Sequence, residues 1–115
     1  MHELSIAQAL IDQAEDIAKQ NHARSVTSIT VAVGALSGVD HDALKFVFPM
    51  AAEGTVAKAA SLTVEAIPVQ VLCHACNRQS NPELPSFACR DCGSADIEVT
   101  GGRELMLKSV DVDVD

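Results

Sequence analysis

The stretch Cys73–Cys92 reads CHACNRQSNPELPSFACRDC and contains all four cysteines of this 115-residue chain. They form two Cys-x2-Cys pairs separated by twelve residues. Two residues between cysteines allow a tight turn to direct both sulfurs at one metal ion, and two such turns complete a tetrahedron. The spacing predicts a zinc ribbon with a structural, closed Zn²⁺ site, whose ligands are Cys73, Cys76, Cys89 and Cys92.

Other interpretations of this stretch stay open. Iron also suits a tetrahedral thiolate site, and the colour of the protein would distinguish it from zinc. A Cys-x2-Cys pair is also typical of redox proteins, although such pairs usually occur singly near a βαβ pattern. His74 could replace a displaced thiolate, but four cysteines need no fifth ligand, so a solvated histidine is the simpler interpretation. Gly93, after the second pair, suits a turn that needs a positive φ.

The cysteines lie in an insertion, 73–102, that is rich in Cys, Pro, Asn and Gly and poor in large apolar residues, so burial alone cannot hold it together. The segments that flank it are typical of strands. LTVEAIPVQVL, at 62–72, predicts one strand in which Pro68 marks an edge or a bulge. RELMLKSVDVDVD, at 103–115, predicts another, because Val110, Val112 and Val114 alternate with aspartates.

The first 36 residues predict a helix followed by a strand. Apolar residues recur at helical spacing over about 5–21. Ser5 and Gln8 match a capping box, which places the start of the helix at Ser5. The following segment, about 26–36, is rich in β-branched residues and alternates between two faces, which predicts a strand.

A second helix is expected in DALKFVFPMAAEGT, at 42–55, with Asp40 or Asp42 as its N-cap. Pro49 removes one backbone donor inside this segment, so we expect a kink or a break there. Gly54 is a suitable residue to end the helix.

The predicted fold class is α/β, with two helices on a three-stranded sheet and an inserted four-cysteine zinc ribbon. Its predicted domains are 1–72 plus 103–115, and 73–102.

Composition and charge exclude several classes of protein. The formal net charge is −8, from eight basic and sixteen acidic residues, which disfavours nucleic acid as a partner. No apolar run reaches eighteen residues, so we expect no membrane span. The first fifteen residues are acidic without a basic flank, which argues against a secretory signal. A cytoplasmic location follows, where an even set of cysteines binds metal more often than it forms disulfides.

The amino terminus places an amine, an imidazole and a carboxylate at Met1, His2 and Glu3. The Met1 amine and the His2 imidazole flank one backbone amide, and these three nitrogens can enclose a metal in fused chelate rings. Such a donor set suits Ni²⁺ or Cu²⁺. The simpler alternative is that both side chains are solvated, with Glu3 favouring the positive end of the first helix.

Several stretches together resemble the HypA/HybF family of hydrogenase nickel-insertion accessory proteins. They are MHELSIAQALI, VTSITVAVGALSGVD, LKFVFPMAAEGT, the two cysteine pairs after a strand, and GGRELMLKSVDVD. The resemblance implies that Met1, His2 and Glu3 form a nickel site and that the four cysteines bind zinc. It also implicates Asp40, for which an N-cap role is the competing interpretation. His22 and His41 match no family ligand and are expected to be surface or capping residues.

The resemblance implies a nickel metallochaperone without catalytic activity that assists assembly of [NiFe]-hydrogenase. Its implied partners are the maturation GTPase HypB and the hydrogenase large subunit, and in some relatives urease and its accessory proteins. We expect a monomer or a weak homodimer, because Val-rich edge strands can pair chains. The alternative is a zinc-ribbon adaptor with an inert amino terminus. An enzyme would need an open metal position or a nucleophile beside a base, and the sequence shows neither pattern.

Overall fold

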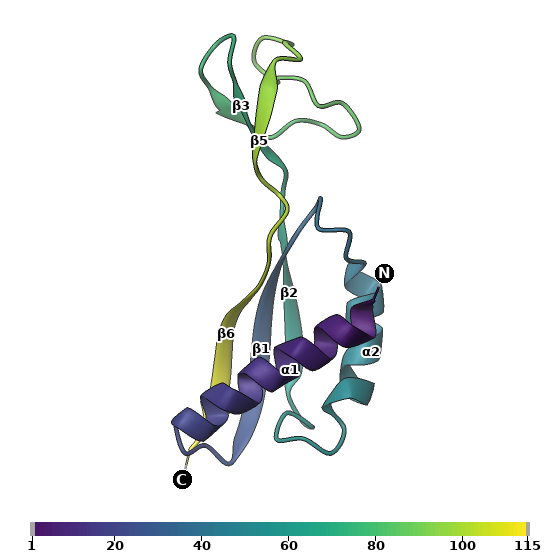
Figure 1. The fold of residues 1–115 in the computed structure, drawn as a ribbon, viewed down its shortest axis with the longest axis vertical. Coiled ribbons are helices and arrows are strands. Elements are labelled where there is room, and N and C mark those ends of the chain that lie inside the picture. The colour runs from purple at the N-terminus through teal and green to yellow at the C-terminus, as the bar shows by residue number, and fades with distance from the viewer. Residues whose placement is uncertain (1, 115) are drawn as a thin grey trace. The chain divides into compact units, whose positions relative to one another are not determined.

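The computed structural model describes residues 2–114, which contain two helices and six strands (Figure 1). The strands form two three-stranded sheets, in the orders β2-β1-β6 and β4-β3-β5. The elements are α1 (Glu3–Gln20), β1 (Ser25–Gly34), α2 (His41–Ala52), β2 (Ser61–Ile67), β3 (Gln70–Cys73), β4 (Gln79–Ser80), β5 (Ile97–Gly101) and β6 (Leu105–Asp113). The predicted α/β class with two helices is confirmed.

The chain divides into two compact units. The helix unit comprises the chain up to Ala32, Gly38–Glu65, and the chain from Met106 onward. The ribbon unit comprises Val33–Ser37 and Ala66–Leu105. Within the described residues, neither unit contains a helix that is long and apolar enough to cross a membrane.

The core of the helix unit is built from both helices and the central strand β1. Its buried members are Ile11, Ala14, Ala18, Val26, Ile29, Phe48, Ala52 and Ala57. Side chains of β2 and β6, including Leu62, Val110 and Val112, pack against this cluster and are partly buried. Aliphatic burial of this kind contributes about 1.5–3 kcal/mol for each large side chain, and it holds α1 and α2 on the sheet.

Helix α1 begins earlier than predicted. Its first residue is Glu3 and its N-cap is His2, whose side chain makes no capping hydrogen bond. Ser5 lies inside the helix, so the predicted capping box with Gln8 is wrong. The buried positions explain the difference, because the helical spacing starts at Glu3 and continues through Ala7 to Leu10. The first turn is therefore held by packing rather than by a serine cap.

The end of α1 uses a histidine where glycine is more usual. His22 adopts a left-handed φ of 53° just after the helix. The adjacent Ala23 N–H donates to the Ala18 carbonyl at 2.8 Å, which closes the last turn. His22 is exposed, in agreement with the expected surface or capping role.

Helix α2 begins as predicted. The Asp40 carboxylate accepts hydrogen bonds from the backbone N–H groups of Asp42 at 2.9 Å and Ala43 at 3.1 Å, so Asp40 is the N-cap. Pro49 lies inside the helix without breaking it, because burial of Phe48 and Ala52 offsets the loss of one backbone donor. The helix ends at Ala52, shortly before Gly54, which has a φ of +77°.

The predicted single strand 62–72 is wrong. Pro68 lies between two separate strands, β2 and β3, which belong to different sheets. A proline cannot donate to a ladder, so the pairing of β2 ends there. Pro68 therefore marks the point where the chain leaves one sheet and enters the other, rather than an edge or a bulge of one strand. The ribbon unit has its own sheet of β3, β4 and β5.

Two glycines permit a close backbone contact within the ribbon unit. A Cβ built on Gly34 would lie 2.1 Å from the Gly102 carbonyl oxygen. The Leu36 N–H donates to that same oxygen at 2.6 Å, and the Gly34 N–H donates to the Glu104 carbonyl at 2.7 Å. Gly102 itself has a φ of +114°. Only a residue without a side chain fits at position 34.

Candidate metal centre

The four cysteine sulfurs lie together in the ribbon unit. Cys73 Sγ is 3.6 Å from Cys92 Sγ, Cys76 Sγ is 3.7 Å from Cys89 Sγ, and all four atoms lie within 4.8 Å of one another. A tetrahedral ion with metal–sulfur bonds of about 2.3 Å separates its ligands by roughly 3.8 Å. The sulfurs form no disulfide. Their arrangement fits a closed four-thiolate metal site.

Both cysteine pairs are held by the same backbone turn. The Asn77 N–H donates to the Cys73 carbonyl at 2.9 Å, and the Gly93 N–H donates to the Cys89 carbonyl at 2.8 Å. Both donor residues have positive φ, 60° at Asn77 and 77° at Gly93. Sequence reasoning found Gly93 but missed Asn77. The sequence did contain a signal for this turn. Asn77 directly follows the first cysteine pair, as Gly93 follows the second, and asparagine tolerates the left-handed region better than most residues.

The small sheet positions the first pair. Cys73 is the last residue of β3 and lies opposite Ile97 of β5, while Leu72 lies opposite Gln79 of β4. The His74 N–H then donates to the Asp96 carbonyl at 2.9 Å. The second pair is tied to the following turn, where the Cys89 N–H donates to the Ser94 carbonyl at 2.9 Å. Strand pairing thus brings together pairs that are distant in sequence.

The protein environment favours one thiolate and opposes another. The backbone N–H groups of Cys92 and Asp91 stabilise the Cys89 thiolate and lower the pKa of that thiol to about 6. At Cys76 the Arg78 backbone N–H favours the thiolate, but burial and the neighbouring thiols outweigh it and raise the pKa to about 12. Four thiolates at one place need a cation to balance their charge, which a divalent metal supplies.

His74 is not a member of this cluster. Its Nε2 atom lies 3.5 Å from Glu98 Oε1, and among residues 2–114 the metal-binding group consists of the four cysteines alone. The side chain of His74 is half exposed. The structure therefore gives His74 a carboxylate neighbour rather than a place among the sulfurs.

Three of the predicted nickel ligands, His2, Glu3 and Asp40, lie in the helix unit, and the fourth, Met1, is outside the described residues. His2 is exposed at the N-cap of α1. Glu3 is only 9 % exposed, and its Oε2 atom accepts a hydrogen bond from the Asp40 backbone N–H at 3.4 Å. The structure thus brings Glu3 and Asp40 together, although 37 positions separate them in the sequence.

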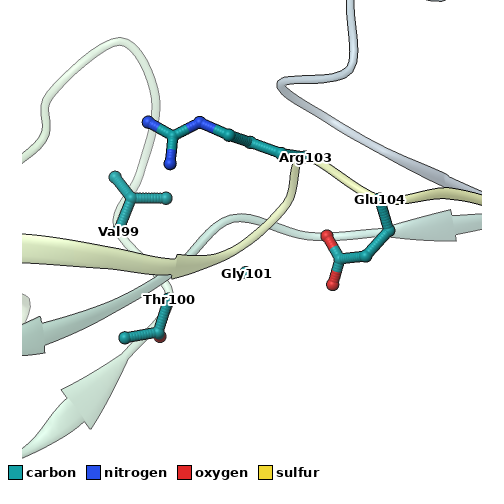
Figure 2. Close-up of a pocket in the computed structure, with 5 residues that line it drawn as sticks. All are labelled: Val99, Thr100, Gly101, Arg103 and Glu104. Atoms are coloured by element: carbon teal, nitrogen blue, oxygen red, sulfur yellow. The ribbon is translucent and has the colours of Figure 1, made fainter.

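A separate shallow depression of about 360 Å³ lies in the ribbon unit (Figure 2). It is lined by Val99, Thr100, Gly101, Arg103 and Glu104. Figure 2 shows the Glu104 carboxylate beside Gly101, whereas the Arg103 side chain extends toward Val99. The Glu104 carboxylate accepts the Gly102 N–H, and such backbone N–H donation lowers the pKa of Glu104. None of the lining residues is a predicted metal ligand.

Fold and site together define a class of protein, a small α/β protein with a four-cysteine metal ribbon. Comparison with known proteins narrows this class. A family described as "Hydrogenase/urease nickel incorporation, metallochaperone, hypA" matches residues 1–112. The chain therefore belongs to the HypA family of nickel metallochaperones for hydrogenase maturation, and the resemblance found in its sequence is confirmed.

Individual relatives match over the whole length. The hydrogenase maturation factor HypA of Aquifex aeolicus is 39 % identical over 115 residues, covering 100 % of both chains. That of Nitrosospira multiformis is 42 % identical over 112 residues, covering 97 % of each. The solution structure of the Ni metallochaperone HypA from Helicobacter pylori is 29 % identical, with a TM-score of 0.69 over 100 % of both chains. A second HypA solution structure has a TM-score of 0.74 at 29 % identity, covering 100 % of this chain and 98 % of that one.

Proposed function

We propose that this protein carries Ni²⁺ at its amino terminus and delivers it to the large subunit of [NiFe]-hydrogenase. The Met1 amine, the His2 backbone amide and the His2 imidazole form the chelate, and Glu3 and Asp40 belong to the site as carboxylates beside these ligands. One observation carries the proposal. The His2 side chain is exposed at the start of α1, in the helix unit, whereas the four cysteines belong to the ribbon unit.

The two sites suit different tasks. Four cysteine ligands fill the coordination sphere of Zn²⁺, so the ribbon site retains its metal and stabilises the fold. A terminal chelate of nitrogen donors suits Ni²⁺ and leaves it accessible to a receiving protein. The positive end of α1 opposes a cation there, and nearby carboxylates offset that cost. The proposal includes no catalytic step, because the protein transfers an ion without changing a covalent substrate.

The proposed partners are the GTPase HypB, the hydrogenase large subunit and, in addition, urease accessory proteins. Membership of the HypA family supports an association with the hydrogenase maturation machinery. The formal charge of −8 favours partners with basic surfaces. We place this work in the reducing cytoplasm, where four unpaired cysteines remain available to a metal.

A nickel titration of the untagged, zinc-loaded protein tests the proposal. The protein has no Trp or Tyr, so metal absorption bands in the near ultraviolet can be measured directly. We expect one Ni²⁺ per chain in the wild type, with binding lost or strongly weakened in His2→Ala and in a variant with one residue added before Met1. His22→Ala, at another exposed histidine, is the matched control and should bind normally.

Equal nickel binding in the wild type, His2→Ala and the extended variant would reject the terminal site. That result would favour the alternative function, a zinc-ribbon adaptor that binds other proteins without carrying nickel. Normal zinc content in every variant shows that the ribbon unit is intact, so loss of nickel cannot be attributed to loss of the four-cysteine site.

A further inference from the structure

We propose that Glu3 and Asp40 act as positioning residues and that neither carboxylate binds the nickel ion. Together they form what we call the carboxylate bridge, which joins the first turn of α1 to the first turn of α2. The bridge consists of the Glu3 carboxylate, the Asp40 backbone N–H and the Asp40 carboxylate. The inference rests on the proposed function, and it assigns the two carboxylates of that site a different role from the amino-terminal nitrogens.

The Glu3 carboxylate is withdrawn from solvent. Among the described residues, Glu3 is the charged residue whose side chain is buried, with 9 % of its surface exposed. Its Oε2 atom accepts a hydrogen bond from the Asp40 backbone N–H at 3.4 Å. This distance is long for a hydrogen bond, but a buried carboxylate is costly without one. The positive end of α1 also favours a negative charge at its first residue. These interactions account for a glutamate at position 3 without a metal bond.

The Asp40 carboxylate is also engaged. Its Oδ1 atom accepts the backbone N–H groups of Asp42 at 2.9 Å and Ala43 at 3.1 Å. Asp40 therefore donates its own N–H to Glu3 while it caps α2. These three hydrogen bonds tie the start of one helix to the start of the other.

The carboxylate bridge fixes the backbone at Glu3, directly after the residues that bind the metal. His2 directly precedes Glu3, and its carbonyl accepts the Ile6 N–H at 3.1 Å, so its backbone is continuous with the held first turn. Ordering a free residue reduces the binding constant by roughly tenfold, because fixing its backbone costs conformational entropy. A terminus that is already ordered at Glu3 avoids part of this cost when it binds nickel.

Amide variants separate positioning from ligation. Glu3→Gln and Asp40→Asn keep an oxygen acceptor but remove the charge, and a neutral amide is a poor substitute for a carboxylate ligand. Glu3→Ala and Asp40→Ala remove the acceptor as well. Asp42→Asn is the matched control, because Asp42 is exposed in the first turn of α2. This substitution removes one negative charge, as Glu3→Gln and Asp40→Asn do.

We expect nickel affinity within about threefold of wild type in Glu3→Gln, Asp40→Asn and Asp42→Asn, with unchanged Ni²⁺ absorption bands. Glu3→Ala and Asp40→Ala should bind about tenfold more weakly, also with unchanged bands, because the ligands remain. Amide hydrogen exchange of the first turn of α1 should accelerate in Glu3→Ala and not in Glu3→Gln. Zinc content and thermal unfolding, measured on each variant, show that the fold persists.

Two outcomes would overturn the inference. One is a loss of affinity in Glu3→Gln or Asp40→Asn as large as in the alanine variants, with shifted absorption bands, which would make that carboxylate a ligand. The other is wild-type affinity in both alanine variants. If His2→Ala binds nickel as the wild type does, the proposed function fails separately. Hydrogen exchange then still tests the bridge, and equal exchange in Glu3→Ala and Glu3→Gln would reject it.

Discussion

The sulfur of Cys73 lies 3.6 Å from the sulfur of Cys92, although 19 positions separate the two residues. Cys73 ends a strand, and Cys92 lies in an exposed turn. No disulfide joins them, and the separation of the sulfurs is close to that of two ligands on one tetrahedral ion. The ribbon unit is therefore arranged so that a metal ion, rather than a large apolar core, joins its two cysteine pairs.

Substitution of one cysteine should release the metal and unfold the ribbon unit. We expect Cys92→Ser to lose its zinc, with faster amide exchange over residues 70–101 than in the wild type. His74→Ala is the control and should keep one zinc per chain, because His74 contacts Glu98 instead of the sulfurs. Elemental analysis and hydrogen exchange measure both effects. Full zinc content in Cys92→Ser would contradict a four-thiolate site.

A side chain at position 34 should destabilise the protein strongly. In Gly34→Ala the Cβ would meet the Gly102 carbonyl oxygen at 2.1 Å, and backbone cannot move aside as a flexible side chain can. We expect a loss of about 3 kcal/mol or more in the free energy of unfolding, measured by urea titration. Gly101→Ala is the control, since its Cβ would lie no closer than 3.4 Å to another atom. Similar losses in both variants would refute the close contact.

Glu104 should make stability depend on pH in the acid range. Backbone N–H donation lowers the pKa of Glu104 below its ordinary value of 4.5, so ionised Glu104 stabilises the folded state. This contribution is complete above pH 4.5 and disappears as the pH falls through the lower folded pKa. Urea titrations of wild type and Glu104→Gln should thus differ at pH 7 and converge in acid. A carboxyl pKa at or above 4.5, measured by NMR, would contradict the prediction.

A core substitution should weaken the helix unit without affecting the metal. Ile29 of β1 is fully buried among side chains of both helices. We expect Ile29→Ala to lower the free energy of unfolding by about 2–5 kcal/mol and Ile29→Val by about 0.5–1.5 kcal/mol. Thermal or urea unfolding measures the loss, and elemental analysis should find unchanged zinc. A loss of zinc in the folded Ile29→Val variant would contradict the prediction.

Local patterns in the sequence were sufficient for much of the fold. Helical spacing located α1 and α2 to within a few residues, and Asp40 was one of two N-caps that the sequence allowed. The N-terminal boundary of α1 was wrong because Ser5 offers a capping side chain while burial of Glu3 and Ala7 extends the helix past it. Capping is a local preference of about 1 kcal/mol, and packing of an apolar face can outweigh it.

The sequence by itself determined the metal ribbon, the α/β class and the family, because each depends on residue types at fixed short spacings or on their order along the chain. Only the tertiary structure decided that Pro68 separates two sheets, that Gly34 meets Gly102, and that Glu3 is buried against Asp40. These relationships join residues that are far apart in sequence or depend on which strands pair. Folding selects them through burial and backbone hydrogen bonding, and no local spacing encodes them.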